Sequence, residues 1–204
     1  WRWPYQRAES CGRVDHRQLL ELLHRAGAID SSYQFHWKRF LFDNFPKGTG
    51  FPAVQAPQPP ADLPVADVKA FSIDDSATTE IDDALSVTGL GTGTVTVGIH
   101  IAAPGLAITP GGELDKLGRA RLSTVYMPGY KITMLPDDVV HIYTLDEGRS
   151  NPAVSLYVQI NEETLETISS ETRLERVPVE VNFRYDKLDH IVTAEWLTDS
   201  SIEV

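Results

Sequence analysis

Five carboxylates crowd into ten residues in the middle of this chain, with no lysine or arginine among them: Asp74, Asp75, Glu80, Asp82 and Asp83. Carboxylates this close repel one another, so at neutral pH they must be neutralised, titrate upward or bind a cation. Sites built from oxygen ligands select hard cations, and Mg²⁺ or Mn²⁺ suits several carboxylates with open positions. The stretch therefore predicts a divalent-metal site that performs chemistry. An acidic turn that caps backbone amides explains the same spacing equally well.

The spacing of the acids limits the backbone that can gather them. If one strand ends at Asp74 and the next begins at Asp82, the turn between them brings both ends to one point. Asp82 and Asp83 are adjacent, so in a regular strand their side chains would face opposite ways. A shared site needs an irregular backbone there, or one aspartate that orients the other. A calcium loop of the helix–loop–helix type fits poorly, because the sixth position lacks glycine and the twelfth lacks an acid.

Alternating apolar residues on both sides of the acidic stretch predict strands. The strongest pattern is residues 94–101, which follow a glycine-rich turn. A helix is expected over residues 113–122, and residues 123–136 have the composition of a loop. The expected strands are 68–73, 84–87, 94–101, 152–160, 164–174 and 177–183, with a short helix at 185–191. This order predicts an α+β fold with a mixed, largely antiparallel sheet and few helices.

Residues 1–51 are expected to form a small helical module. One amphipathic helix follows Asp15, a candidate cap, and should end at Gly27. A second begins at Ser31 or Ser32 and runs to Phe45. Such a pair is expected to be a packing module, and a winged-helix-like DNA reader is the alternative. Residues 52–67, with five prolines, predict an extended linker to a second domain at 68–204.

Composition narrows the class of protein. Hydrophobic content of 42% and charged content of 23% are ordinary for a globular domain. No apolar run approaches the ~18 residues of a membrane span, and no secretory signal opens the chain. The lone Cys11 fits a reducing compartment, so we expect a cytoplasmic protein. A net charge of −11 argues against a nonspecific nucleic-acid binder with a basic surface, but not against a metal-dependent nucleic-acid enzyme.

Several separated blocks, in order, resemble the opening part of the catalytic domain of the ribonuclease II/ribonuclease R (RNB) family. The blocks are residues 72–85, 97–102, 114–115 with Arg119, 123–128 and 132–136, and the likeness spans roughly residues 68–190. Members are processive hydrolytic 3′→5′ exoribonucleases that use Mg²⁺ and release nucleoside 5′-monophosphates. The resemblance implies that residues 68–204 are the N-terminal portion of such a domain. It also implies single-stranded RNA as substrate and Mg²⁺, or Mn²⁺, as cofactor.

The resemblance also assigns roles to the acids. It implies that Asp74, Asp82 and Asp83 bind the metal and that, with Glu80, they form the catalytic set. Glu80 stands where the family usually has a fourth aspartate. Its extra methylene keeps the charge but shifts the oxygens by about one bond length, which would alter metal geometry.

Two tyrosines and one histidine complete the candidates. Tyr126 matches the family's tyrosine that holds the terminal nucleotide, and Tyr185 more weakly matches one that contacts RNA near the cleavage point. Aromatic rings at such positions stack on bases without reading sequence. His100 is a conceivable general base, but on an alternating apolar strand it is expected to be structural.

Departures from the family pattern define the alternative function. Ala103 replaces a usual aspartate, and the chain ends before the family's later arginine and glutamate. We therefore expect the isolated chain to be weakly active or inactive, as part of a longer exoribonuclease. The alternative is a noncatalytic RNA-binding or regulatory protein that retains the fold. Neither interpretation includes a membrane partner.

Overall fold

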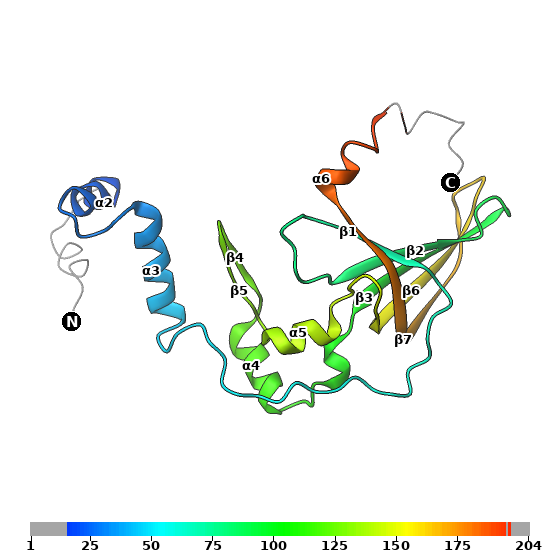
Figure 1. The fold of residues 1–204 in the computed structure, drawn as a ribbon, viewed down its shortest axis with the longest axis horizontal. Helices are drawn as coiled ribbons and strands as arrows, with labels where there is room; N and C mark the ends of the chain where they lie inside the picture. Colours follow the sequence, from blue (N-terminus) through cyan, green and yellow to red (C-terminus); the bar gives the residue numbers. More distant parts are fainter. Residues whose placement is uncertain (1–15, 195, 197–204) are drawn as a thin grey trace. The chain divides into compact units, whose positions relative to one another are not determined.

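The computed structural model describes residues 16–194 and residue 196 (Figure 1). By its internal contacts the chain divides into two units, Trp1–Pro52 and Ala53–Val204. In the part of the chain that is described, no helix has the length and apolarity needed to span a membrane.

The first unit contains two helices, α2 (His16–Arg25) and α3 (Ser32–Asn44), and no strand within residues 16–52. α2 ends where the sequence predicts, because Gly27 adopts a φ of +67° and its N–H donates to the His24 carbonyl. α3 starts at a cap whose Ser31 hydroxyl accepts from the Gln34 N–H at 3.1 Å. The predicted cap Asp15, like Cys11, lies outside the described residues.

The basic residues of this unit bear on the DNA-binding alternative. Lys38, Arg39 and Lys47 are all exposed, as that alternative requires. Lys38 is ion-paired with Asp30, however, and Arg39 with Asp43, both at 3.6 Å. The winged-helix interpretation therefore stays a prediction.

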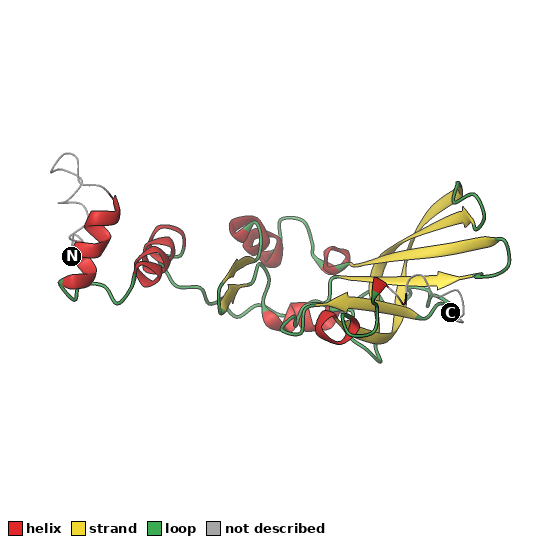
Figure 2. Cartoon of the chain, turned by 90° about the horizontal axis from the view of Figure 1, so that it is seen from above, coloured by secondary structure: helices red, strands yellow, loops and turns green. Residues whose placement is uncertain are grey.

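The second unit is built on a closed five-stranded barrel (Figures 1 and 2). Its strands are β1 (Ala70–Asp74), β2 (Asp83–Thr88), β3 (Thr94–Ala102), β6 (Ser150–Asn161) and β7 (Thr167–Arg184). Neighbours pair antiparallel in the order β1-β2-β3-β6-β7, and a parallel β1–β7 pair closes the barrel. The predicted α+β class with a largely antiparallel sheet is confirmed.

β7 corrects the prediction of two separate strands at 164–174 and 177–183. It is one strand that changes partner: its first part pairs with β6 as far as Pro178, and from Val179 it pairs with β1. Pro178 lies opposite Ser150, the first residue of β6. A proline has no N–H for a ladder, and here it occupies the position where one ladder gives way to the other.

Residues 123–143 contain elements that the sequence did not predict. Within the expected loop, β4 (Val125–Met127) and β5 (Tyr130–Ile132) form a two-stranded hairpin, and α5 (Asp137–Tyr143) follows. Gly129 has a φ of +75°, so Pro128-Gly129 makes the tight turn that joins the two strands. α4 (Glu113–Arg121) matches its predicted bounds closely, the 3₁₀ turn η1 (Pro104–Ala107) precedes it, and α6 (Tyr185–Leu188) is shorter than expected.

Two apolar clusters support this unit. The barrel end is filled by small and branched side chains of Ala66, Ala70, Ile81, Ala84, Leu145, Ala153, Val177 and Val179. Outside the barrel, Leu114 of α4 packs with Val139 and Tyr143 of α5. Val54 and Ala56 of the Pro-rich segment pack on this second cluster, so the segment lies against the unit rather than spanning free solvent.

The barrel interior also holds a polar group of residues. His100 is fully buried, and its Nε2 and Nδ1 hydrogen-bond the hydroxyls of Ser86 at 2.9 Å and Ser155 at 2.8 Å. Burial lowers the pKa of the imidazole, and the carboxylate of Glu175 opposes this effect. Both ring nitrogens are satisfied inside the protein, which is the structural role expected of this histidine.

Candidate active site

The acidic stretch connects the end of β1 to the start of β2. Asp74 is the last residue of β1, and β2 begins at Asp83, so Asp82 lies just before the strand. Ile81 and Ala84 are both buried although they are three residues apart. Strict alternation is therefore broken between them, and Asp82 and Asp83 are both exposed. This is the irregular backbone that a site shared by two adjacent aspartates requires.

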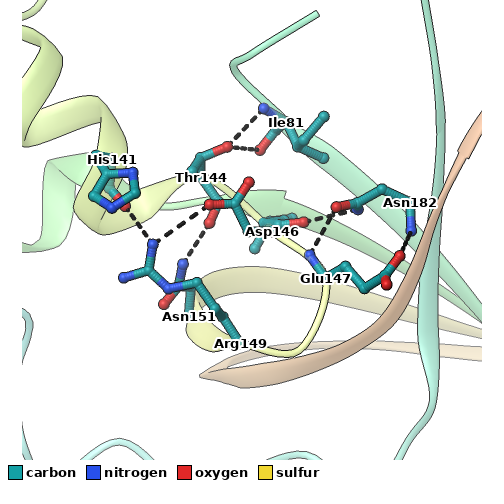
Figure 3. Close-up of polar contacts among 9 residues, drawn as sticks. Ile81, His141, Thr144, Asp146, Glu147, Arg149, Asn151 and Asn182 are labelled. Atoms are coloured by element: carbon teal, nitrogen blue, oxygen red, sulfur yellow. Dashed lines mark hydrogen bonds and ion pairs between the residues drawn. The ribbon is translucent and has the colours of Figure 1, made fainter. Parts of the chain in front are cut away.

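The segment after α5 fixes that irregular backbone. The Thr144 hydroxyl accepts from the Ile81 N–H at 2.7 Å (Figure 3). The Leu145 N–H donates to the Ile81 carbonyl at 2.9 Å. Thr144 is itself buried, and its carbonyl accepts from the Asn151 side chain. Because all these groups are removed from water, the bonds hold Ile81 inward and leave the next two residues facing out.

The same segment also reaches the other end of the acidic stretch. The Asn182 side-chain amide donates to the Leu145 carbonyl at 3.0 Å and to the Ser72 hydroxyl at 2.8 Å. That hydroxyl donates to Asp74 Oδ2 at 2.5 Å. Asn182 is oriented in turn by two bonds with Glu147, through its side-chain oxygen and its backbone N–H (Figure 3). Asp74 is thus held by a relay of polar side chains.

Two cations hold the loop between the acids. Arg184 Nη1 donates to the backbone carbonyls of Asp75 at 2.9 Å and Thr78 at 3.2 Å. Lys131 Nζ, from β5, donates to Thr79 Oγ1 at 2.9 Å and to Glu80 Oε1 at 3.0 Å. The Glu80 side chain is only 12% exposed, so this ion pair is partly shielded from water. Within residues 16–194, Glu80 is therefore the one acid of this stretch with an ion-pair partner.

Electrostatics single out Asp82. Surrounding protein removes part of the water from its carboxylate, which raises its pKa, and the charges of Glu80, Asp83 and Asp74 raise it further. Lys131 acts in the opposite direction. The repulsion that the sequence predicts within the acidic stretch is therefore present in the folded protein.

The donor set fits a hard cation chemically, because it consists of carboxylate oxygens under mutual repulsion. In the described part of the chain, however, no three His, Cys, Asp or Glu side chains are gathered closely enough to hold a metal ion. The structure thus provides carboxylate donors and negative charge for a metal, but the acidic side chains are not gathered around one point.

The two predicted RNA-binding tyrosines reach this region from different elements. Tyr126 lies on β4 and is 70% exposed, and its cross-strand partner is Lys131, which contacts the acidic loop. Tyr185 is 53% exposed and follows Arg184, the partner of Asp74 in the parallel β1–β7 pair. Both rings are available for stacking, and each is linked through one neighbour to the acidic stretch.

The sequence did not predict five residues that support this region: Ser72, Lys131, Thr144, Asn182 and Arg184. Ser72 opens the first block that resembles the RNB family and lies two residues before Asp74, so its nearness to the acids was a usable signal. Lys131 lies between two of the blocks and reaches Glu80 across 51 residues of sequence. Thr144 and Asn182 carry no local signal. They act through contacts made across 63 and 110 residues of sequence.

Comparisons with known proteins give a consistent result. A sequence model of the RNB domain matches residues 64–201. Exoribonuclease 2 of Vibrio cholerae is 34% identical over 147 residues, which cover 70% of this chain and 21% of that protein. The chain therefore spans about a fifth of the length of this curated relative.

Solved structures share the fold. Yeast Ssd1, described as a pseudonuclease, has a TM-score of 0.61 at 22% identity, covering 68% of this chain and 18% of its own. Mycoplasma genitalium RNase R, in complex with ribose-methylated single-stranded RNA, has a TM-score of 0.59 at 19% identity, covering 71% and 22%. At these identities the likeness is one of fold alone.

Proposed function

The chain belongs to the RNB family, since the RNB-domain match covers more than half of it, and on that premise we propose that the protein carrying it is a hydrolytic 3′→5′ exoribonuclease. Its substrate is single-stranded RNA, its products are nucleoside 5′-monophosphates and its compartment is the cytoplasm. The observation that carries the proposal is the acidic stretch, whose two ends are held by buried or partly buried hydrogen bonds to the same segment after α5. A hydrogen-bond network that fixes carboxylates in this way is expected of a functional site rather than of a surface turn.

Asp74, Asp82 and Asp83 would hold a divalent cation, Mg²⁺ or Mn²⁺, and Glu80 would complete the acidic set. Bound there, such a cation would activate a water and offset the charge that develops during phosphodiester hydrolysis. The protein's own contribution is positional. Ser72 orients the carboxylate of Asp74 at 2.5 Å, and Thr144 keeps Ile81 buried so that Asp82 and Asp83 face outward.

RNA binding falls to the exposed aromatic rings. Tyr126 would stack on the terminal nucleotide, and Tyr185 would contact RNA close to the scissile bond. Stacking tolerates any base, which suits an enzyme that removes nucleotides one after another. The net charge of −11 implies that the cation, rather than a broad basic surface, offsets the phosphate charge at the site.

The test uses the natural protein that carries this chain. Incubation with 3′-labelled single-stranded RNA and Mg²⁺ should release labelled nucleoside monophosphate, and 5′-labelled RNA should shorten stepwise. Asp82→Asn, added EDTA and a DNA strand of the same sequence serve as controls and should each abolish release. Absence of monophosphate release from the wild-type protein would sink the enzymatic proposal.

A second candidate is a noncatalytic RNA-binding protein. Two observations favour it: Ala103, in place of the family's usual aspartate, is buried, and Glu80 is tied to Lys131. RNA binding without monophosphate release, unchanged by Asp82→Asn, identifies this candidate. The isolated chain of 204 residues is expected to bind or cleave weakly in either case.

A further inference from the structure

Lys131 joins the β4–β5 hairpin to the acidic loop. Its ammonium contacts Glu80 at 3.0 Å and Thr79 at 2.9 Å, and its side chain is 34% exposed. A second lysine–glutamate pair, Lys69 with Glu180 at 3.2 Å, is far more open, with side chains 81% and 57% exposed. The contact of Lys131 is therefore the more shielded of the two, and a shielded ion pair is screened less by water and salt.

The hairpin needs such a contact to have a fixed orientation. β4 and β5 have three residues each and pair only with one another in the described sheet. A two-stranded hairpin of this length is marginal by itself in water. Its base is anchored, since Arg121 donates to the Thr133 carbonyl at 3.2 Å and the Met134 N–H donates to Thr124 Oγ1 at 3.1 Å. Nearer the turn, Lys131 supplies the contact with the acidic loop.

The register places Tyr126 on the same side of the hairpin as Lys131. The two residues are directly opposite in the antiparallel pair, and opposite side chains project from one face with Cβ atoms about 5 Å apart. Fixing the ammonium on Glu80 therefore also fixes the aromatic ring relative to the acidic stretch. A pocket of about 370 Å³ adjoins this contact and is lined by Thr79, Glu80, Lys131, Asp137, Val140 and His141.

We propose that Lys131 is a positioning residue, whose ion pair with Glu80 sets the distance between the ring of Tyr126 and the carboxylates. The proposal rests on the proposed function, because the ring is taken to stack on the terminal nucleotide. With the hairpin docked, a stacked nucleotide presents its phosphate to the acids. Without the ion pair, the ring remains exposed but no longer has a fixed place, and RNA binding weakens.

A double-mutant cycle on the natural protein tests this. Affinity for a fluorescent single-stranded RNA is measured in EDTA, so that neither metal binding nor turnover contributes. Lys131→Met and Tyr126→Ala are each expected to weaken binding about tenfold, roughly the value of one stacked base. If Lys131 acts through Tyr126, the double variant binds no more weakly than Tyr126→Ala alone.

Matched variants separate positioning from general damage. Lys131→Arg keeps a cation that can reach both acceptors and should restore most of the affinity, and Lys69→Met removes the open pair and should change nothing. Thr79→Val removes the second acceptor of Lys131. Like Lys131→Met it should weaken RNA binding, but it should disturb folding less than Lys131→Met does. Thermal melts verify that each variant is folded.

Two results would overturn the proposal while leaving the proposed function intact. One is wild-type affinity in folded Lys131→Met, and the other is a double variant whose loss equals the sum of the two single losses. A failure of the function itself looks different, because the wild-type protein would then bind no RNA and release no monophosphate.

Discussion

Asp74 and Arg184 are partners at the carboxyl ends of two parallel strands, β1 and β7. This pairing closes the barrel. It also brings the start of the acidic stretch and the start of α6 to the same end of the barrel. Arg184 then holds the loop through the carbonyls of Asp75 and Thr78, while Tyr185 emerges beside it. The pairing of β1 with β7 therefore both closes the barrel and brings residues of the candidate site together.

Replacing Asn182 by alanine should destabilise the barrel. The amide nitrogen donates to the Leu145 carbonyl and the Ser72 hydroxyl, and the amide oxygen accepts from the Glu147 N–H. Its loss leaves partly buried groups without partners, which costs about 1–3 kcal/mol. Urea unfolding, followed by a probe in the second unit, measures this loss.

Asn44 provides the control for that experiment. Its side chain also donates to a backbone carbonyl, that of Phe40, but on the exposed surface of α3 in the other unit. Asn44→Ala should leave the unfolding midpoint of the barrel unchanged. If Asn182→Ala unfolds at the same urea concentration as the wild-type protein, the hydrogen bonds from Asn182 through Ser72 to Asp74 contribute nothing to stability.

Local signals explain which elements could be predicted from the sequence. Residues 94–101 alternate strictly and α4 has a clear apolar side, so β3 and α4 lie where they were expected. β4, β5 and α5 are too short to show a period, and they were missed. Ser31 and Gly27 act at helix ends through contacts within a few residues, which is why the sequence located them.

Nonlocal contacts account for the rest. The acids could be recognised as a group because they are neighbours in sequence, but the supports of Asp74 and Ile81 come from Asn182 and Thr144, far along the chain. The parallel pairing of the first and last strands of the barrel is equally invisible to a local pattern. The sequence thus identified the acids as a candidate site, which stays a prediction, but not the distant residues that hold them.

Gly98→Ala should destabilise the protein through the polar interior. A Cβ at this position would lie 2.3 Å from the Ser86 hydroxyl and 2.8 Å from His100 Nε2. Both neighbours are buried and hydrogen-bonded to each other, so relief requires breaking that bond or shifting the strand. A loss of about 1–3 kcal/mol is expected in chemical denaturation. Gly105→Ala, where a Cβ meets open space, is the matched control, and a similar loss there would contradict this explanation.

The stability of the barrel should depend on pH through His100. Burial lowers the pKa of this imidazole in the folded state, so the unfolded chain binds the proton more readily. The stability that neutral, buried His100 contributes is fully present above about pH 6.5, the pKa of the unfolded histidine. This stability is lost as the pH falls through the pKa of His100 in the folded state. His100→Gln should flatten the pH dependence of the unfolding free energy below about pH 6.5. An unchanged slope in this variant would assign the dependence to other groups.

Asp82→Asn should stabilise the metal-free protein. The variant removes a carboxylate that faces the charges of Glu80, Asp83 and Asp74. Because the residue is exposed, the gain should be only ~0.5 kcal/mol, or roughly 1–2 °C in the unfolding midpoint. Saturating Mg²⁺ should raise the midpoint of the wild-type protein by linkage and leave that of Asp82→Asn almost unchanged. The exposed Asp62 gives the control, since Asp62→Asn should show the wild-type response to Mg²⁺.

Tyr126 should contribute to RNA binding through its ring rather than its hydroxyl. The residue is 70% exposed on a short hairpin, so its removal disturbs little packing and the folded state should survive. Tyr126→Ala is expected to lose about 1–3 kcal/mol of affinity for single-stranded RNA, whereas Tyr126→Phe keeps the stacking surface and most of the affinity. Fluorescence anisotropy with homopolymers of different bases checks both points. Equal losses in the two variants would point to a hydrogen bond from the phenol, and a loss confined to one base would show sequence recognition instead of stacking.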